Sequence, residues 1–520
     1  MGFAEWATRW SRDAMHCVST WTPELIKTNM STGIKRLAKE TAIYGLPSIL
    51  GRFLNWLLVP MYVRVLSGTG EFGVYTNIYG WVALLLIVLT YGMETGFFRF
   101  VNKEGEPMRV YATAMFSVGC TSLLFAVLGL GFLHPVSCFL GYGGYPEYLG
   151  MMIAVVAADA VCALPFAYLR YKGRAVRFAA LKFVTIGLNI GLNLFFFILC
   201  PRLAEAVPEA VEWFYRPAYG VGYVFVANVM TTAVTFLLLL PDMLPGFRHK
   251  PDFPLLRRML GYSFPILLLG IAGIFNQTAD KILFPFLFAD KEYAAGQLGI
   301  YGACFKMAAV MVMFIQAFRY AYEPFVFARN REEGSRRAYV ETMRYFVIFG
   351  LLIFLGVMFY MDLLKYFITP AYYPGLRVVP VVMAGEFFFG IYFNLSLWYK
   401  LTDQTHWGAW FSLSGCVVTV LMIVLLAPLY GYMACAWASF CCNLLMMAAS
   451  YIIGQKKFPV PYDLKSAFTY FAVAAAVYAA GMLPAIESEG WRAGYRTLLL
   501  LAFLAFIARK EHLPKKTRRG

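Results

Sequence analysis

Long apolar runs separated by short polar segments dominate the chain from about residue 43 onward. Each run is close to the ~20 residues that an α-helix needs to cross a bilayer, and none alternates in polarity as the strands of a membrane barrel do. The pattern therefore predicts fourteen membrane-spanning helices. They cover residues 43–65, 74–97, 110–132, 147–168, 176–200, 217–240, 260–288, 298–322, 343–361, 377–399, 408–427, 431–453, 465–483 and 493–508.

Composition supports this architecture and excludes several other classes. Of the 520 residues, 60% are hydrophobic and only 14% are charged, whereas a soluble domain carries about 25% charged residues. A soluble fold of this size could not bury so much apolar surface. We therefore expect an all-α polytopic membrane protein, and not a soluble enzyme, a disordered chain or a disulfide scaffold.

Basic residues collect on one side of the predicted helices. If the N-terminus is cytoplasmic, the segments on that side hold 31 lysines and arginines and the segments on the other side hold 8. Cytoplasmic loops carry such an excess of basic residues. Both termini are therefore predicted to be cytoplasmic, with a basic tail at residues 509–520, and the net charge of +16 indicates membrane topology rather than binding to nucleic acid.

The polar N-terminal segment, residues 1–42, lacks the apolar core of a signal peptide. Met30 opens a second start, so residues 1–29 are either an interfacial amphipathic helix or an upstream extension that is not translated. The ten cysteines include no CxxC pair, and we expect small buried side chains rather than metal ligands. The cysteines that lie inside apolar runs are Cys120, Cys162, Cys304, Cys416 and Cys435.

Three short patterns recur in the same order about 220 residues apart, which indicates an internal repeat. The matched segments are 44–47 with 262–265, 71–75 with 297–301, and 109–111 with 337–339. Six predicted helices separate the copies, so both copies begin on the same side of the membrane, and two parallel lobes would face a central cavity. The lobes are predicted at 43–240 and 260–453, with a cytoplasmic inter-lobe loop at 241–259 and two further helices in 454–508. Pro47 and Pro265 occupy equivalent positions and either kink these helices or begin them.

Residues 37–81 resemble the opening of polysaccharide and O-antigen flippases, a family of the multidrug/oligosaccharidyl-lipid/polysaccharide exporter superfamily. The resemblance rests on the turn Arg64-Val65-Leu66-Ser67 and on the acidic-aromatic-Gly-x-Tyr pattern at 71–75. Asp280-Lys281, residues 298–301 and Lys306 fit the same family. The resemblance covers roughly residues 30 to 510.

This resemblance implies a transporter that flips a polyprenyl-pyrophosphate-linked oligosaccharide from the cytoplasmic to the outer leaflet of a bacterial inner membrane by alternating access. It implies membrane lipids and glycan-assembly proteins as partners. It leaves a multidrug exporter and a lipid II flippase as alternatives.

Ionisable side chains inside the predicted spans mark candidate functional residues, because each costs about 2.5–3.5 kcal/mol at the bilayer centre. Four bases are candidates to bind the pyrophosphate, since ammonium and guanidinium groups lower the barrier for an anion: Arg52, Lys281, Lys306 and Arg319. Four acids are candidates to carry coupling protons or sodium ions: Glu94, Asp159, Asp280 and Glu386. The alternative is that these charges pair and hold helices together. Adjacent helical residues point about 100° apart, so Lys306 is the expected partner of Asp280.

An enzyme is disfavoured because all five histidines lie in loops or at span ends, so no histidine–acid pair inside the membrane is available as a base. No nucleotide-binding GxxxxGK[ST] loop occurs, so ATP is not expected as the direct energy source. No cofactor is expected besides a coupling ion. The many aromatic residues are expected mainly at the lipid surface, with Tyr372, Tyr373 and Trp398 as candidates for contact with a sugar.

Overall fold

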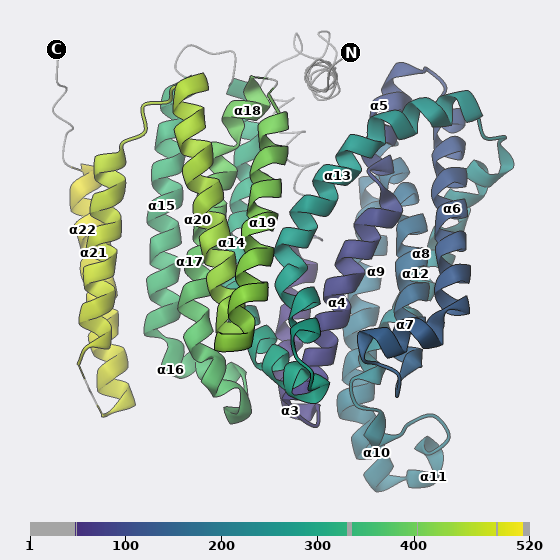
Figure 1. The fold of residues 1–520 in the computed structure, drawn as a ribbon, viewed down its shortest axis with the longest axis horizontal. Helices are drawn as coiled ribbons and strands as arrows, with labels where there is room; N and C mark the ends of the chain where they lie inside the picture. The colour runs from purple at the N-terminus through teal and green to yellow at the C-terminus, as the bar shows by residue number, and fades with distance from the viewer. Residues whose placement is uncertain (1–46, 48, 330–334, 403, 485–486, 513–520) are drawn as a thin grey trace. The chain divides into compact units, whose positions relative to one another are not determined.

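The structure, a computed structural model, describes residues 47, 49–329, 335–402, 404–484 and 487–512. All regular secondary structure in these ranges is helical (Figure 1). Thirteen helical stretches are long and apolar enough to cross a membrane, and they correspond to the second to the fourteenth predicted span. The described part of the first span is helical at 49–57, followed by α3 (Val59–Val65). The all-α polytopic fold is confirmed, and the chain is a multi-pass membrane protein.

The helices group into two compact units, and α14 (Lys291–Arg329) and α20 (Tyr432–Lys457) contribute to both. Unit 1 holds the described residues up to Gly302 and residues 404–438. Its other main helices are α4 (Thr69–Thr90), α5 (Met93–Lys103), α6 (Pro107–Gly131), α7 (Leu133–Leu140), α8 (Pro146–Tyr171), α9 (Ala175–Leu194), α10 (Cys200–Ala206), α11 (Pro208–Val211), α12 (Gly222–Arg248), α13 (Phe253–Leu283) and α19 (His406–Tyr430). Unit 2 holds the described residues of 303–402 and of 439–512. Its other main helices are α15 (Ser335–Phe359), α16 (Met361–Leu364), α17 (Val378–Leu395), α18 (Leu397–Leu401), α21 (Leu464–Met482) and α22 (Glu489–His512). The expected repeat and its lobe boundaries stay predictions.

The segment expected as an inter-lobe loop, 241–259, is mostly helical. α12 continues to Arg248 and α13 begins at Phe253, where the Asp252 carboxylate caps the helix by accepting the Leu255 N–H at 2.9 Å. The expectation followed apolar runs, but a helix satisfies its own backbone and can continue beyond the hydrocarbon layer with polar side chains. Pro265 lies inside α13 and therefore does not begin it.

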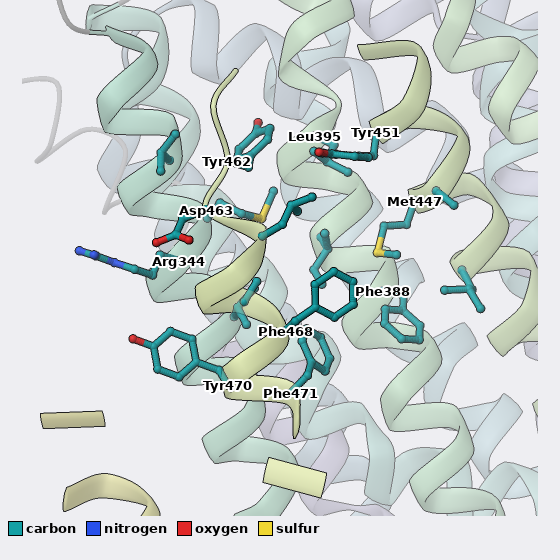
Figure 2. Close-up of a pocket in the computed structure, with 18 of the residues that line it drawn as sticks. Arg344, Phe388, Leu395, Met447, Tyr451, Tyr462, Asp463, Phe468, Tyr470 and Phe471 are labelled. Atoms are coloured by element: carbon teal, nitrogen blue, oxygen red, sulfur yellow. The ribbon is translucent and has the colours of Figure 1, made fainter. Parts of the chain in front are cut away.

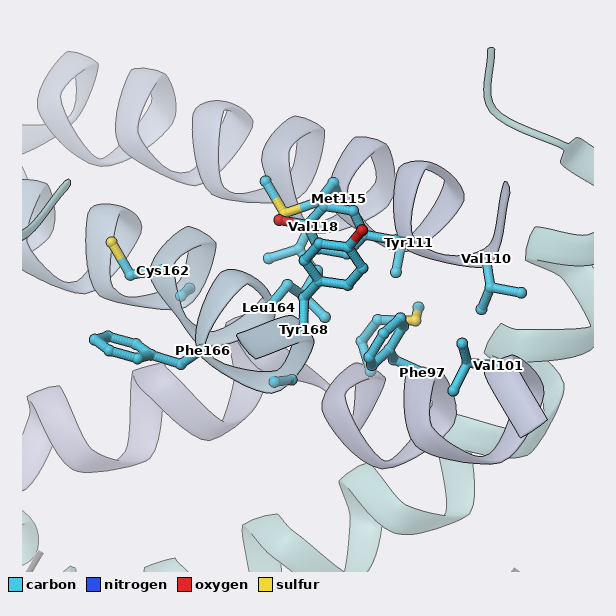
Figure 3. Packing of buried hydrophobic residues seen from close by; sticks show 14 of the residues in the cluster. Phe97, Val101, Val110, Tyr111, Met115, Val118, Cys162, Leu164, Phe166 and Tyr168 are labelled. Atoms are coloured by element: carbon cyan, nitrogen blue, oxygen red, sulfur yellow. The ribbon is translucent and has the colours of Figure 1, made fainter. Parts of the chain in front are cut away.

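A continuous aromatic and aliphatic core holds α5, α6, α8, α12 and the first half of α13 together (Figure 3). At its centre the Tyr111 and Tyr168 rings stack with centroids 4.2 Å apart, and the Tyr111 hydroxyl donates to the Asp242 carbonyl at 2.9 Å. Phe97 packs edge-on against both rings. The hydrogen bond accounts for the polar end of a tyrosine that is otherwise fully buried.

Glycines allow α4 and the start of α14 to touch at their backbones. A Cβ atom on Gly73 would lie 1.8 Å from the Ala295 carbonyl oxygen, and one on Gly299 would lie 1.8 Å from the Thr69 carbonyl oxygen. Small residues permit this approach between membrane helices, where van der Waals contact rather than the hydrophobic effect drives packing.

The α21–α22 hairpin packs on α15 within unit 2. Arg496 of α22 is only 8% exposed. It donates from Nε to the Gly481 carbonyl at 3.1 Å and from Nη1 to the Phe359 carbonyl at 3.2 Å and to Asp362 Oδ2 at 2.7 Å. Arg496 falls within the predicted span 493–508, and its hydrogen bonds fasten α22 to the end of α15 and to the residues that follow it.

The nine described cysteines form no disulfide bond with one another. Cys162, Cys304, Cys416 and Cys435 are buried as predicted, but Cys120 is exposed. Cys120 shares helical spacing with the exposed Leu123, Leu124 and Val127 of α6, so it belongs to the outward face of that helix.

Candidate functional site

A buried ion pair lies near the end of α13 in unit 1. The Lys281 ammonium donates to both oxygens of Asp280 at 3.0 Å. The Tyr301 hydroxyl of α14 donates to Asp280 Oδ2 at 2.5 Å, and the Lys281 backbone N–H donates to Oδ1 at 2.9 Å. The carboxylate and the ammonium side chain are 8% and 15% exposed, so water contributes little to either charge. The carboxylate is therefore satisfied by protein donors.

The expected pairing of Asp280 with Lys306 is wrong, because Lys281 is the base that pairs with Asp280. The angle of about 100° between adjacent helical residues applies to the Cα–Cβ bonds. The four-carbon stem of lysine is flexible enough to return its ammonium group to a neighbouring residue.

Further hydrogen bonds connect this pair to α4 and to the segment before α8. Asn77 of α4 donates from Nδ2 to the Lys281 carbonyl at 2.6 Å and accepts from the Tyr142 hydroxyl at 2.7 Å. Burial raises the pKa of Tyr142 above its ordinary value, so this hydroxyl stays a donor. The polar cluster formed by Asn77, Tyr142, Asp280, Lys281 and Tyr301 thus joins α4, α13 and α14 inside unit 1.

Asp159 lies in a second polar region, between α8, α9 and α12. The Thr232 hydroxyl donates to Asp159 Oδ1 at 3.2 Å, and the charge of Lys182 acts on the same carboxylate. The Lys182 ammonium lies 3.9 Å from the centroid of the Phe166 ring. The sequence analysis had not selected Lys182, although a lysine within an apolar run is the signal that identified the other bases.

Glu94 of α5 forms an ion pair with Arg170 of α8. In the same unit, Arg177 of α9 lies 2.8 Å from Asp242 of α12. Both pairs join neighbouring helices. They fit the alternative stated above, in which charges inside the membrane pair to hold helices together. Arg52 lies in the helical segment 49–57 and is exposed.

The remaining candidates lie in unit 2. Lys306 and Arg319 are both on α14, 13 residues and therefore about 20 Å apart along the helix axis. The Arg319 guanidinium covers the Phe393 ring at 3.9 Å. Glu386 lies on α17 and is partly buried. The structure thus brings Asp280 and Lys281 together, and the shared cavity expected for the four bases stays a prediction.

Arg344 of α15 is a base that sequence reasoning missed. It lies 3.2 Å from Glu511 of α22, whose other oxygen accepts the Tyr470 hydroxyl of α21 at 2.5 Å. An arginine within the apolar run 343–361 is the signal that could have identified it. Arg344 is the second residue of that run, where a charge is easily assigned to the preceding loop.

An apolar pocket of about 560 Å³ lies beside Arg344 within unit 2 (Figure 2). Side chains of α15, α17, α20 and α21 line it, among them Phe388, Met447, Phe468 and Phe471. Its size falls in the range of ligand sites, about 300–1,000 Å³. In the described residues no group of three or more histidines, cysteines or acids could hold a metal ion.

Comparison with solved structures identifies proteins that share this architecture. No family model matches the sequence, and no curated protein matches it. The lipid II flippase MurJ in an inward closed conformation is similar with a TM-score of 0.69 at 12% identity, over 90% of this chain and 99% of that chain. The chain has the fold of this flippase.

Multidrug transporters share the fold too. An inward-facing MATE family transporter of the MOP superfamily has a TM-score of 0.60 at 12% identity, over 80% of this chain and 94% of that chain. MATE in the straight conformation has a TM-score of 0.54 at 14% identity, over 80% and 95%. Identities this low establish the fold and transfer no residue roles.

Proposed function

We propose that this protein is a transporter that moves a polyprenyl-pyrophosphate-linked oligosaccharide from the cytoplasmic to the outer leaflet by alternating access. The observation that carries the proposal is the buried Asp280–Lys281 pair, which is held by helices of a multi-pass membrane protein. Ionisable groups in such positions are costly, and an ionisable residue inside the membrane is therefore a candidate for a functional site. The similarity of the fold to a flippase and to exporters supports the same class.

An anionic lipid head is the proposed cargo because the candidate residues include as many bases as acids, four of each, whereas an exporter of cationic drugs should favour acids. Arg52 is exposed on its helix, and Arg319 keeps its guanidinium against an aromatic face, where donors stay available. Lys281 and Lys306 complete the proposed set. In the conformation described, Lys281 is neutralised by Asp280, so its contribution requires that pair to open.

The acids Glu94, Asp159, Asp280 and Glu386 are proposed to carry the coupling ion, a proton or sodium. Glu94 and Asp280 are each paired with a base, and a coupled cycle would exchange that base for the ion. The proposal assigns no catalytic residue and no other cofactor. It places the protein in a bacterial inner membrane, with both termini cytoplasmic and glycan-assembly proteins as partners.

A lipid II flippase is the second candidate, and one observation favours it over a multidrug exporter. The match to the lipid II flippase covers 90% of this chain, and the matches to MATE transporters cover 80%. The additional part of this chain that the lipid II flippase match covers is close in length to α21 and α22 with their connection, since these helices have 19 and 24 residues. The charge argument does not separate lipid II from a lipid-linked oligosaccharide, because both carry a pyrophosphate.

The deciding experiment uses a deletion strain and measures lipid-linked oligosaccharide in the membrane, finished surface glycan and lipid II. Accumulated precursor with lost surface glycan is expected. Accumulated lipid II would favour the second candidate. Unchanged glycan with increased sensitivity to cationic drugs would refute both and favour export of drugs.

Variants then test the proposed bases. Arg52→Ala should insert normally but reduce surface glycan at least about tenfold, the effect of losing one charge-assisted hydrogen bond, while Arg52→Lys keeps part of the activity. Arg337→Ala is the matched control, because the Arg337 side chain is 87% exposed on α15. Full activity of Arg52→Ala would remove Arg52 from the proposed set.

A further inference from the structure

Tyrosines gather at one end of unit 1, where α8 begins and the chain enters α12. The Tyr145 and Tyr148 rings stack in parallel, with centroids 5.2 Å apart and planes at 6°. Tyr219 meets Tyr148 edge-on with centroids 5.6 Å apart, and the Tyr148 hydroxyl donates to the Tyr219 carbonyl at 3.2 Å. Tyr148 is 5% exposed, whereas Tyr145 is 54% exposed. One face of the Tyr145 ring is therefore fixed against protein, while the rest of the ring is open.

This end of unit 1 extends past the hydrocarbon layer. The helical stretch Ala175–Ala206 has 32 residues and is therefore about 48 Å long, whereas the hydrocarbon layer is about 30 Å thick. Only three residues separate α8 from α9, so the excess length lies at the other end, where α10 and α11 extend beyond α7 (Figure 1). Between α11 and α12, residues 216–218 are exposed and belong to no α-helix, and such backbone does not face lipid. The tyrosines beside this segment therefore face water.

Two carboxylates lie beside the tyrosines. Glu147 is exposed, and its charge acts on Tyr148 and Tyr219. The charge of Glu71 also acts on Tyr148. A Cβ atom at residue 220 would overlap the Glu71 carboxylate, and Gly220 has a φ of +46°, so a glycine lets the chain lie against this acid. Among the described residues, neither carboxylate forms an ion pair.

This arrangement matches the chemistry of a sugar ring. A pyranose carries C–H groups on its faces, which the negative face of an aromatic ring attracts, and hydroxyl groups around its edge, from which a carboxylate accepts hydrogen bonds. Tyr145 presents the aromatic face, and Glu147 presents the acceptor. Two carboxylates without a countercharge repel a phosphate. The site therefore fits the glycan part of the proposed cargo and not its pyrophosphate.

We propose that Tyr145 and Glu147 form a carbohydrate-binding site that holds a sugar of the cargo after it has crossed the membrane. Tyr145 stacks on the sugar ring, Glu147 accepts from its hydroxyls, and Tyr148 and Tyr219 hold the Tyr145 ring in place. With the N-terminus cytoplasmic, as the basic residues predict, α8 is the fourth span and begins on the outer side. The inference rests on the proposed function for its cargo and on this topology for its side.

The test measures binding of the glycan without its lipid. The probe is the oligosaccharide that mild acid releases from the lipid-linked precursor of the same strain, free of lipid and pyrophosphate. Calorimetric titration into the full-length protein in detergent gives its affinity. Tyr145→Ala should weaken binding about five- to tenfold, because it removes the stacking ring, and Tyr145→Phe should bind like the wild type. Tyr430→Ala is the matched control, because Tyr430 is 66% exposed at the end of α19.

A second variant tests the carboxylate. Glu147→Gln should weaken binding of the same oligosaccharide about fivefold, because a neutral amide oxygen replaces a charged acceptor. Glu209→Gln is its control, since Glu209 is an exposed acid of α11. In cells, Tyr145→Ala should lower surface glycan while Tyr430→Ala leaves it unchanged. Agreement between affinity and surface glycan across these variants would support the site.

Three results would overturn the inference. Equal affinities of the wild type, Tyr145→Ala and Glu147→Gln would remove the site, and the proposed function would stand if the deletion strain still loses surface glycan. No binding by the wild type would remove the sugar as ligand; lower surface glycan in Tyr145→Ala would then indicate a glycan-assembly protein as the occupant. Unchanged surface glycan in the deletion strain would refute the proposed function itself and, with it, the cargo of this site.

Discussion

Removing one partner of the Asp280–Lys281 pair should destabilise the protein more than removing both. The substitutions are Asp280→Asn, Lys281→Met and the double variant. Asp280→Asn keeps an oxygen that can accept from Tyr301, whose hydroxyl donates to the carboxylate at 2.5 Å. It removes the negative charge of Asp280 from beside the Lys281 ammonium, which is 15% exposed.

The magnitudes follow from the contacts that each variant leaves behind. An uncompensated buried charge costs about 3–5 kcal/mol, and replacing both members of a pair is often nearly neutral. Asp280→Asn should therefore cost about 3 kcal/mol, since Lys281 then retains the Gln277 carbonyl at 3.1 Å as an acceptor. Lys281→Met should cost less, because the carboxylate keeps the Tyr301 hydroxyl and a backbone N–H. The double variant should be more stable than Asp280→Asn alone.

Thermal unfolding of the four purified proteins in one detergent completes a double-mutant cycle. The decisive result is the sign of the coupling: the second substitution must restore stability lost in the first. If the two losses simply add, the ion pair contributes no coupling energy and the reasoning from burial fails. Surface-glycan measurements on the double variant then separate the two readings of the pair, because a structural pair would leave transport intact and a coupling pair would not.

Three further predictions concern packing, anchoring and pH. Gly73→Ala should lower the free energy of unfolding by about 1–3 kcal/mol through overpacking, because the added Cβ atom would meet the Ala295 carbonyl. Gly70→Ala is the control, since nothing lies within 4 Å of its Cβ position. Equal unfolding temperatures of the two variants would contradict this prediction. Arg496→Met should cost about 1–3 kcal/mol by leaving two buried carbonyls without their donor, while Arg492, 3.4 Å from Asp362 Oδ2, still pairs with that carboxylate. Arg496→Lys should restore only part of the unfolding temperature. Hydrogen bonds from the Leu255 N–H and Arg109 lower the pKa of Asp252, so its stabilising effect is present at neutral pH, declines below about pH 4 and is lost as the pH falls through the lowered pKa. Asp252→Asn should flatten that acid limb in a stability profile against pH.

The apolar runs were sufficient to predict the helices because membrane insertion depends on length and hydropathy, which a sequence states directly. Thirteen predicted spans correspond to helices of the structure. Their ends were less predictable, as the continuation of α12 to Arg248 illustrates. A helix can extend past the hydrocarbon layer at little cost, so hydropathy does not mark its end.

Charged partners could not be predicted from the sequence in the same way. Asp280 and Lys281 were selected individually, because a charge in an apolar run is conspicuous. Their pairing was missed because it depends on how a flexible side chain folds back. The partners Arg344 and Glu511 are 167 residues apart, and only the docking of α22 on α15 brings them together.

The Arg496 anchor also has a consequence for how the protein is made. Asp362 precedes Arg496 by 134 residues, so it enters the membrane well before the ribosome has produced its partner. The apolar 18-residue windows of α21 and α22 have mean hydropathies of only 1.2 and 1.3, the lowest of the thirteen described spans, so their insertion into the bilayer is the least favourable. Their retention in the bilayer therefore depends on capture by α15. A chain that stops after α20 would present Asp362 and Arg344 without their partners, and these unpaired charges would distinguish an unfinished product from a finished one to the proteases that survey the membrane.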